Sequence, residues 1–335
     1  NKSTGELFNC VDATAGANIW ANIGGGSGDS WQFQGTVNGY CIGGYQSGGS
    51  ALASNVIQKF SFTSDANATN VGVTLSAFLY AAATSRSRTH GYCSNGSTGS
   101  DASSSPPHTV SSTIQKFTFA SDNDSTSVGN TVNSLWGAAG NSSAVNGYLA
   151  GGSPANTVIE KFTFSTDGNS SSVGNLTQIV SYSTSQTSQT DGYSTLGEGA
   201  APAYTTVSVI DKYSFSTDGT ASNIGNMTRA GWAGSGNSSS THGYACGGST
   251  SDVIDKFSFA SGGNGTDVGN ISQTGFGRTG ASSTTHGYIM AGSDGRGGAN
   301  GSNIIEKFSF SSDGNGVDIA DLTHSRGKYA SGTQY

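Results

Sequence analysis

The chain has 335 residues and is rich in Gly, poor in Pro and acidic, with a formal net charge of −7 at pH 7. Nucleic acid is an unfavourable partner for such a chain, because binding to phosphates requires a basic surface. No stretch is long and apolar enough to insert into a membrane, and none shows the apolar spacing of a helix. Short aromatic and β-branched segments recur throughout, which predicts an all-β globular protein.

The first 30 residues differ from the rest of the chain. Glu6–Val11 and Asn18–Ile23 have the composition of two strands around a DATAGA turn, and a Gly/Ser linker follows them. We therefore expect residues 1–30 to form an N-terminal β-hairpin connector, and residues 31–335 to form a separate domain.

That second part repeats one short segment six times, each copy with a lysine inside an apolar strand. The copies are VIQKFSF (Val56–Phe62), TIQKFTF (Thr113–Phe119), VIEKFTF (Val158–Phe164), VIDKYSF (Val209–Phe215), VIDKFSF (Val253–Phe259) and IIEKFSF (Ile304–Phe310). The copies recur at steps of 44 to 57 residues, and a period in this range indicates a repeat architecture such as a propeller.

Each repeat divides into four short strands, here called A to D. In the copy that begins at Arg229, A is the Ser-rich run before HGY, B is YACGG, C is VIDKFSF and D is TDVGNIS. Dipeptides such as Asn146-Gly147 and His242-Gly243 between A and B predict type I′ hairpins with positive φ. A second tight turn follows C at an SD or TD phrase, for example Asp218. Four-stranded meanders of this kind, arranged around an axis, form a β-propeller.

The repeated lysines are predicted to be structural, because a residue present in every repeat is an unlikely catalyst. They are Lys59, Lys116, Lys161, Lys212, Lys256 and Lys307. We expect each ammonium group to pair with a carboxylate or carbonyl of a neighbouring strand or blade. The acids that precede several of these lysines, such as Asp255, are expected to be structural for the same reason.

The C-terminal segment resembles another strand A with no strand B after it, whereas the first repeat has only a stub before its strand B. Arg326–Tyr335 is therefore predicted to complete the first blade and to remove the open sheet edges. This arrangement predicts six blades in one closed domain.

Residues suited to catalysis or metal binding do not gather in the sequence. His90, His242 and His286 occupy equivalent turns of different repeats, so a shared metal site is unfavourable. The four cysteines have no metal-ligand or disulfide spacing and are expected to be free thiols. We expect no enzymatic activity, no catalytic residues, no metal and no cofactor. Among the acids outside the repeat positions, Glu198 is the one singled out as a candidate.

Variation between repeats is the better indication of a binding surface. The B–C loops are extended at Ser97–Ser112, Glu198–Ser208 and Ser293–Asn303. If these loops lie on one face, they would form a decorated rim suited to recognition, although solvent-filled loops without a ligand are an equal alternative. The candidate binding residues in the rim are Pro106, Pro107, His108, Glu198, Tyr204 and Arg296.

Two resemblances bear on function. Strand B phrases such as GYCIGG (Gly39–Gly44) and GYACGG (Gly243–Gly248), with the aromatic strand C, resemble kelch-type propellers, although the strand D tryptophan of that family is replaced by phrases such as Val173-Gly174-Asn175. The segment TGELFNCVDATAGANIWANIGGG resembles a hairpin module of tailed-bacteriophage virion proteins, and the repeats resemble those of marine phage virion proteins.

These resemblances imply a non-enzymatic virion structural protein: a tail fibre, head fibre or decoration protein. It would be assembled in the host cytoplasm and carried on the virion. Its N-terminal segment would contact other virion proteins, and its propeller a host-surface glycan or protein; homo-oligomer formation stays open. The alternative is a secreted or surface carbohydrate-binding propeller, located outside the cell. A third option, given less weight, is an enzyme with its site in the axial channel.

Overall fold

The computed structural model describes residues 8–12, 19–22, 31–46, 52–78, 82–98, 109–154, 156–293 and 301–335. The chain divides into two compact units, Asn1–Gln32 and Phe33–Tyr335. The described residues form strands and turns without any α-helix. Among these residues, therefore, no helix is present that could cross a membrane.

The first unit contains the two strands expected from its sequence. They are β1 (Phe8–Asp12) and β2 (Ile19–Asn22), which pair in antiparallel fashion with Cys10 opposite Trp20.

The second unit is built from four-stranded antiparallel meanders. Their first strands (A) are β7 (Ala83–Arg86), β13 (Ala139–Ser142), β17 (Thr184–Thr187), β21 (Ser235–Ser238), β25 (Thr279–Ser282) and β29 (Ser331–Gln334). The second strands (B) are β3 (Asn38–Ile42), β8 (His90–Ser94), β14 (Asn146–Ala150), β18 (Asp191–Thr195), β22 (His242–Gly248) and β26 (His286–Met290).

The outer strands complete each meander. The third strands (C), which carry the repeated lysines, are β5 (Leu52–Ser61), β11 (Thr113–Thr118), β15 (Val158–Thr163), β19 (Val207–Ser214), β23 (Ser251–Ser258) and β27 (Ser302–Ser309). The fourth strands (D) are β6 (Thr69–Phe78), β12 (Thr126–Asn130), β16 (Ser171–Asn175), β20 (Ser222–Gly231), β24 (Thr266–Asn270) and β28 (Val317–Lys328). Three short strands lie in B–C connections: β4 (Tyr45–Gln46), β9 (Ser97–Thr98) and β10 (Thr109–Val110).

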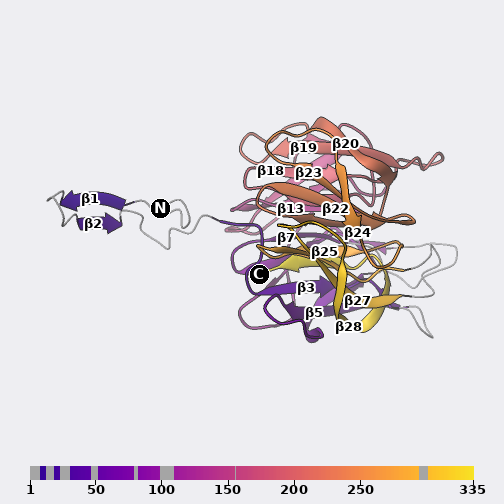
Figure 1. The fold of residues 1–335 in the computed structure, drawn as a ribbon, viewed down its shortest axis with the longest axis horizontal. Helices are drawn as coiled ribbons and strands as arrows, with labels where there is room; N and C mark the ends of the chain where they lie inside the picture. Colours follow the sequence, from indigo (N-terminus) through magenta and orange to yellow (C-terminus); the bar gives the residue numbers. More distant parts are fainter. Residues whose placement is uncertain are drawn as a thin grey trace. The chain divides into compact units, whose positions relative to one another are not determined.

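The meanders are arranged as a β-propeller (Figure 1). Strand A of each meander lies beside strand A of the next, and β29 lies beside β7, so the ring around the axis closes. Four of the sheets are separate and have four strands each. Counted as separate sheets, the described residues therefore contain four blades rather than the six expected.

Apart from β9 and β10, which pair only with each other, the remaining strands of the second unit form one nine-stranded sheet. It contains β25-β26-β27-β28 and β29-β3-β5-β6, joined where β4 pairs with both β28 and β5. The predicted pairing of the C-terminal segment with the first repeat is confirmed, since Gly332 of β29 lies opposite Cys41 of β3, and Figure 1 places the C-terminus beside β3. The predicted start of this segment is wrong, because Arg326 belongs to β28.

Strand C buries both of its faces, as its alternation predicts. Ile254 of β23 packs with Ile289 and Phe308 on one side, whereas Phe257 packs with Tyr193 on the other. The apolar core therefore lies between neighbouring sheets. Cys41, Cys93 and Cys246 are free and buried in it, and desolvation raises the pKa of Cys93 to about 12, so this thiol is unreactive at neutral pH.

The predicted type I′ turns are wrong. Between β7 and β8 the chain turns at Arg88–Thr89, where the Ser87 amide donates to the His90 carbonyl at 2.9 Å, and His90 already belongs to the strand without positive φ. Glycine follows the histidine for another reason: a Cβ atom on Gly91 would stand 2.5 Å from the ring of Phe117. The glycine is needed for close packing against strand C, not for a turn.

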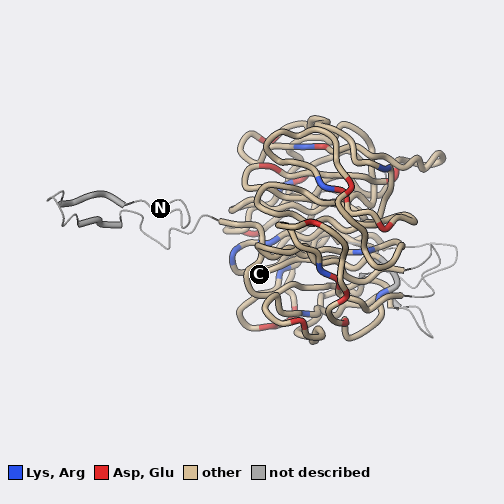
Figure 2. The backbone as a smooth tube through the Cα atoms, in the orientation of Figure 1, with Lys and Arg blue, Asp and Glu red and all other residues tan. Residues whose placement is uncertain are grey.

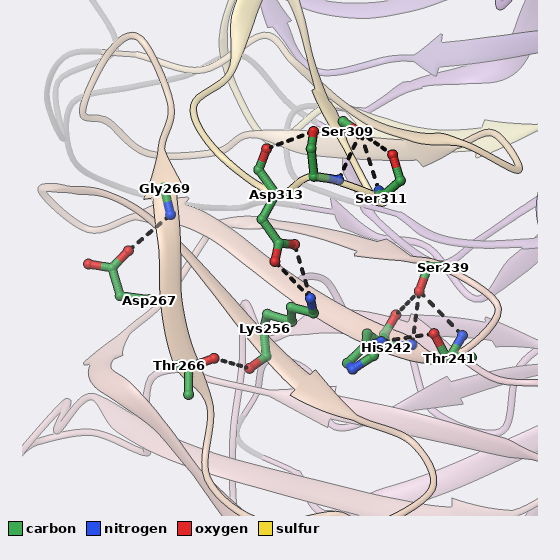
Figure 3. Close-up of polar contacts among 11 residues, drawn as sticks. Ser239, Thr241, His242, Lys256, Thr266, Asp267, Gly269, Ser309, Ser311 and Asp313 are labelled. Carbon is green, nitrogen blue, oxygen red and sulfur yellow. Dashed lines mark hydrogen bonds and ion pairs between the residues drawn. The ribbon is translucent and has the colours of Figure 1, made fainter.

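The repeated lysines pair with carboxylates, as expected. Five of them reach an aspartate in the C–D turn of the next meander, for example Lys116 to Asp167 at 2.5 Å and Lys256 to Asp313 at 2.8 Å. The Lys59–Asp122, Lys161–Asp218 and Lys307–Asp65 pairs repeat the contact. Figure 3 shows Lys256 extended toward Asp313, and Figure 2 shows basic and acidic positions distributed over the sheets.

Lys212 is the exception, and the sequence explains it. The next meander has Gly262 where the others have aspartate, and Lys212 instead lies 3.3 Å from Asp191 at the start of its neighbouring strand β18. Gly262 has a φ of 61°, close to the 53° of Asp218, so its backbone suits an aspartate.

We expect Gly262→Asp to recreate the missing pair with Lys212. Asp191→Asn should lower the free energy of unfolding by roughly 0.5 kcal/mol, the ordinary value of an exposed ion pair, and adding Gly262→Asp should recover it. Urea unfolding of the two single variants and the double variant measures this. Additive effects, without recovery in the double variant, would contradict the pairing.

Candidate functional site

One end of the propeller is formed by the starts of strands A and the ends of strands B, such as the opposed residues Ala139 and Ala150. We call this end the B–C face and the opposite end, at Ser142 and Gly147, the A–B face. A cavity of about 590 Å³, including its open mouth, lies at the B–C end of the axis and is lined by strands A and the D–A connections before them. A concave site at which several elements converge is a candidate ligand site.

The cavity mouth is held by a chain of backbone hydrogen bonds between neighbouring D–A connections. The Tyr182 amide donates to the Gly137 carbonyl at 2.7 Å, and the Ala233 amide to the Tyr182 carbonyl at 2.8 Å. The same bond joins Gly277 to Ala233 and Tyr329 to Gly277, at 2.8 and 2.9 Å. Backbone hydrogen bonds therefore link five of the D–A connections in a chain around the mouth.

All five of these residues are in the left-handed region. Gly137 and Gly277 adopt it easily, but Tyr182 and Tyr329 have φ values of 54° and 55°. For tyrosine this backbone is strained, and such strain is concentrated at functional sites. The two strained tyrosines therefore mark the mouth as the strongest site candidate.

Each described connection also supplies one aromatic side chain, either at the left-handed position or immediately before it. These residues form what we call the axial aromatic cluster: Trp136, Tyr182, Trp232, Phe276 and Tyr329. Where the earlier residue is aromatic, the left-handed residue is Gly or Ala, as in Trp232-Ala233; where it is not, the left-handed residue is Tyr, as in Ser181-Tyr182. Tyr182 and Tyr329 line the cavity, whereas Trp136, Trp232 and Phe276 contact Tyr182 or one another beside it.

Tyr182 is the centre of the cluster. Its ring centroid lies 5.4 Å from that of Trp232 and 5.1 Å from that of Tyr329, and its hydroxyl accepts a 2.6 Å hydrogen bond from the Trp136 indole. Trp232 contacts Phe276 in turn, at 5.0 Å between centroids. Trp232, Phe276 and Tyr329 are buried, whereas Tyr182 and Trp136 are partly exposed. Partly exposed aromatic faces beside polar groups suit the binding of an amphipathic ligand.

The B–C loops support these connections. Antiparallel bridges join Trp136 to Ser153, Ser181 to Glu198 and Phe276 to Ser293. Extended B–C loops, such as the one that contains Glu198, therefore emerge on the same face as the axial cavity. Variation in these loops can alter the surroundings of the mouth without changing the sheets below it.

The rim residues predicted from sequence have different outcomes. Pro106, Pro107, His108 and Arg296 lie outside the described residues. Glu198 is buried and contributes its backbone, accepting from the Ser181 amide at 2.9 Å. Tyr204 is 57% exposed and has a φ of 44°, so it is available on the rim, although it does not line the axial cavity.

The axial mouth has little of the chemistry that catalysis needs. The residues that line it include Tyr182, Tyr329 and Arg278, but no Asp, Glu, His or Cys. The turn histidines lie apart and each contacts an adjacent threonine, for example His242 Nδ1 and Thr241 Oγ1 at 2.8 Å (Figure 3). No group of three His, Cys, Asp or Glu suited to a metal occurs in the described part of the chain.

The acids before the repeated lysines accept hydrogen bonds from the D–A connections that lead to the cavity mouth. Glu160 is buried and accepts from the backbone amides of Val132 and Asn133 at 2.9 and 3.0 Å. Asp211 accepts from the Thr177 amide at 2.8 Å, and desolvation raises the pKa of its carboxyl group. These carboxylates fix the start of the D–A connection, which explains their recurrence.

The sequence interpretation missed the axial aromatic cluster, although a signal was present. An aromatic residue occurs three or two positions before the start of every strand A. The pairs of residues at these positions are Tyr80-Ala81, which lies outside the described residues, and Trp136-Gly137, Ser181-Tyr182, Trp232-Ala233, Phe276-Gly277 and Lys328-Tyr329. The aromatic residue is the first of the two in some repeats and the second in others, so no fixed sequence motif identifies it.

Neither a protein-family model nor a curated protein matches the chain.

Proposed function

We propose that this protein is a non-enzymatic recognition protein whose propeller binds its ligand at the B–C face, through the axial aromatic cluster. The observation that carries the proposal is the strained pair Tyr182 and Tyr329, with φ values of 54° and 55° and rings 5.1 Å apart at the cavity mouth. Strain of this kind is retained where it serves binding. A β-propeller suits this role, because its closed sheets hold the loops rigidly.

A glycan is the ligand class that we favour. A sugar ring offers an apolar face to Tyr182 and Trp136 and hydroxyl groups to the backbone carbonyls and hydroxyls around them. The lining of the mouth without a carboxylate pair supports binding rather than hydrolysis, because a glycosidase needs two carboxylates beside the bond that it cleaves.

We further propose that the propeller has six blades. On this interpretation the nine-stranded sheet is two blades joined by β4, and β29 is strand A of the first one. The closed ring of six neighbouring strands A supports the count. The proposed kelch-like ancestry rests on the strand B and C phrases alone.

The biological setting that we favour is a virion, with this chain as a tail fibre, head fibre or decoration protein that contacts the host surface. The hairpin at β1 and β2 supports the proposed connector to other virion proteins. The alternative is a secreted or surface carbohydrate-binding propeller. Electron microscopy decides between them: density for the chain on a particle supports the first, and a freely secreted protein supports the second.

The binding proposal is tested on a glycan array with the full chain and three single variants. Tyr182→Ala and Trp136→Ala should each weaken binding at least tenfold, because each removes a ring that the ligand would contact. Tyr204→Ala is the matched control: it removes an exposed tyrosine from the rim, outside the axial aromatic cluster, and should leave binding unchanged. Loss of binding only in Tyr204→Ala would show that the ligand binds at the rim and not at the axial aromatic cluster. Turnover of a bound oligosaccharide would contradict the non-enzymatic assignment.

A further inference from the structure

A second cavity lies at the A–B end of the axis. It shares middle residues of strands A, such as Gly140 and Gly236, with the cavity at the B–C end. It encloses about 450 Å³, its open end included. Its walls include the last or nearly last residue of each strand A. These equivalent residues are Arg86, Ser142, Thr187, Ser238, Ser282 and Gln334. Four are hydroxyl residues, one is an amide, and Arg86 alone carries a charge.

Arg86 is more than nine-tenths buried, with 7% of its surface exposed. Its Nη1 donates to the carbonyls of Phe33 and Gln34 at 3.2 and 3.0 Å, and its Nε to the Ser87 carbonyl at 3.3 Å. Nη2 has no acceptor among the described residues. Burial, followed by repulsion from Arg88, lowers the pKa of Arg86 to about 10, so the guanidinium stays charged at neutral pH.

Three serine hydroxyls around the cavity also have an O–H group without an acceptor among the described residues. Ser142 Oγ accepts from the Arg86 amide at 2.8 Å, Ser238 Oγ from the Thr187 amide at 3.0 Å, and Ser282 Oγ from the Ser238 amide at 3.0 Å. Each of these oxygens already accepts a hydrogen bond, and their O–H groups donate to no described residue. Each hydroxyl therefore retains a proton to donate.

The cavity thus combines a buried positive charge with several unused donors, and no carboxylate is among the residues that line it. Such a set favours a ligand that is negatively charged and only accepts hydrogen bonds. A tetrahedral oxyanion has four oxygens and can accept from several directions at once, which matches donors arranged around an axis.

We propose that the A–B end of the axis is a binding site for one free tetrahedral oxyanion, sulfate or phosphate, with Arg86 as its charged ligand and the hydroxyls of Ser142, Ser238 and Ser282 as further donors. The proposal is independent of ligand binding at the B–C face. If it failed, Arg86 would be only a brace between β7 and the Phe33–Gln34 segment.

Isothermal titration of the full chain with sodium sulfate, at constant ionic strength set by sodium chloride, tests the site. We expect saturable binding with one ion per chain, weakened at least tenfold in Arg86→Gln and partly retained in Arg86→Lys. Because sulfate also stabilises proteins generally by exclusion from their surface, only a saturable signal that depends on Arg86 supports the site. Lack of saturation, or equal affinity in Arg86→Gln, would overturn it.

A second variant covers the case in which Arg86→Gln does not fold. Ser238→Ala with Ser282→Ala keeps the guanidinium and removes two donors, and should weaken sulfate binding several-fold. Crystals of the unchanged protein soaked in selenate should show an anomalous peak within hydrogen-bonding distance of Arg86. Unchanged affinity in the serine variant, or selenate bound only elsewhere, would count against the proposal.

Discussion

Deletion of Ser331–Tyr335 should lower the free energy of unfolding by roughly 5 kcal/mol, because it removes a whole strand from the closed ring. β29 pairs with β3 from Ser331 opposite Ile42 to Gln334 opposite Gly39. Tyr335 adds a ring stacked at 5.0 Å on Phe119 and a carbonyl that accepts from three amides. The total free energy of unfolding of most domains is only about 5–15 kcal/mol. Chemical denaturation and the exchange rates of the β3 amides measure the loss.

Tyr335→Ala is the matched control, since it keeps the strand and removes only the stacked ring. It should cost about 1–2 kcal/mol, the value of one partly buried aromatic contact. A synthetic peptide with the sequence of residues 329–335 should restore protection of the β3 amides in the deletion variant. An unfolding midpoint unchanged by the deletion would show that β29 does not close the ring.

Gly236→Ala should cost about 3 kcal/mol or more, because the axis has no room for a methyl group at this position. A Cβ atom on Gly236 would overlap the carbonyl oxygen of Ser185 in the neighbouring strand A, and backbone cannot move aside cheaply. Gly140, Gly280 and Gly332 meet the equivalent carbonyl in the same way. Thermal unfolding of the variant against the unchanged protein measures the effect.

Two controls separate this steric cost from other effects of substitution. Ser185→Ala changes the equivalent residue of the neighbouring strand, where a Cβ is already accommodated, and should stay within about 0.5 kcal/mol. Gly219→Ala places a methyl group in open space at a φ of 102°. The loss of stability in this variant therefore measures backbone strain alone. Equal stability of Gly236→Ala and Ser185→Ala would contradict the packing at the axis.

Much of the architecture could be predicted because it depends on repeated local patterns. The alternation in VIDKFSF identifies strand C and both of its buried faces, and the half-repeat at the C-terminus identifies its partner in the first repeat. Pairing of the lysines could also be anticipated, because a buried stem with a charged head requires an acceptor. Even the exception at Lys212 is visible in the sequence, as Gly262 where the other repeats have aspartate.

The errors arose where a residue type has more than one physical use. His90-Gly91 resembles a turn, but the glycine is required by the ring of Phe117. Phe117 lies 26 residues further along the chain, and it reaches Gly91 only because β11 pairs with β8. Glu198 stays a candidate rim residue from the sequence; it is buried, and its backbone bridges to Ser181 and Thr206.

By itself, the sequence determined the strands, their order and the closure of the ring, because period-two alternation and repeated spacing are local properties of the chain. Only the tertiary structure decided where ligands are expected to bind. Trp136, Tyr182 and Tyr329 are far apart in the chain and meet because strands A converge on one axis. Likewise, Arg86 faces a cavity of serine donors because equivalent positions of successive repeats meet there. Convergence on an axis is a property of the closed ring, and no single repeat contains it.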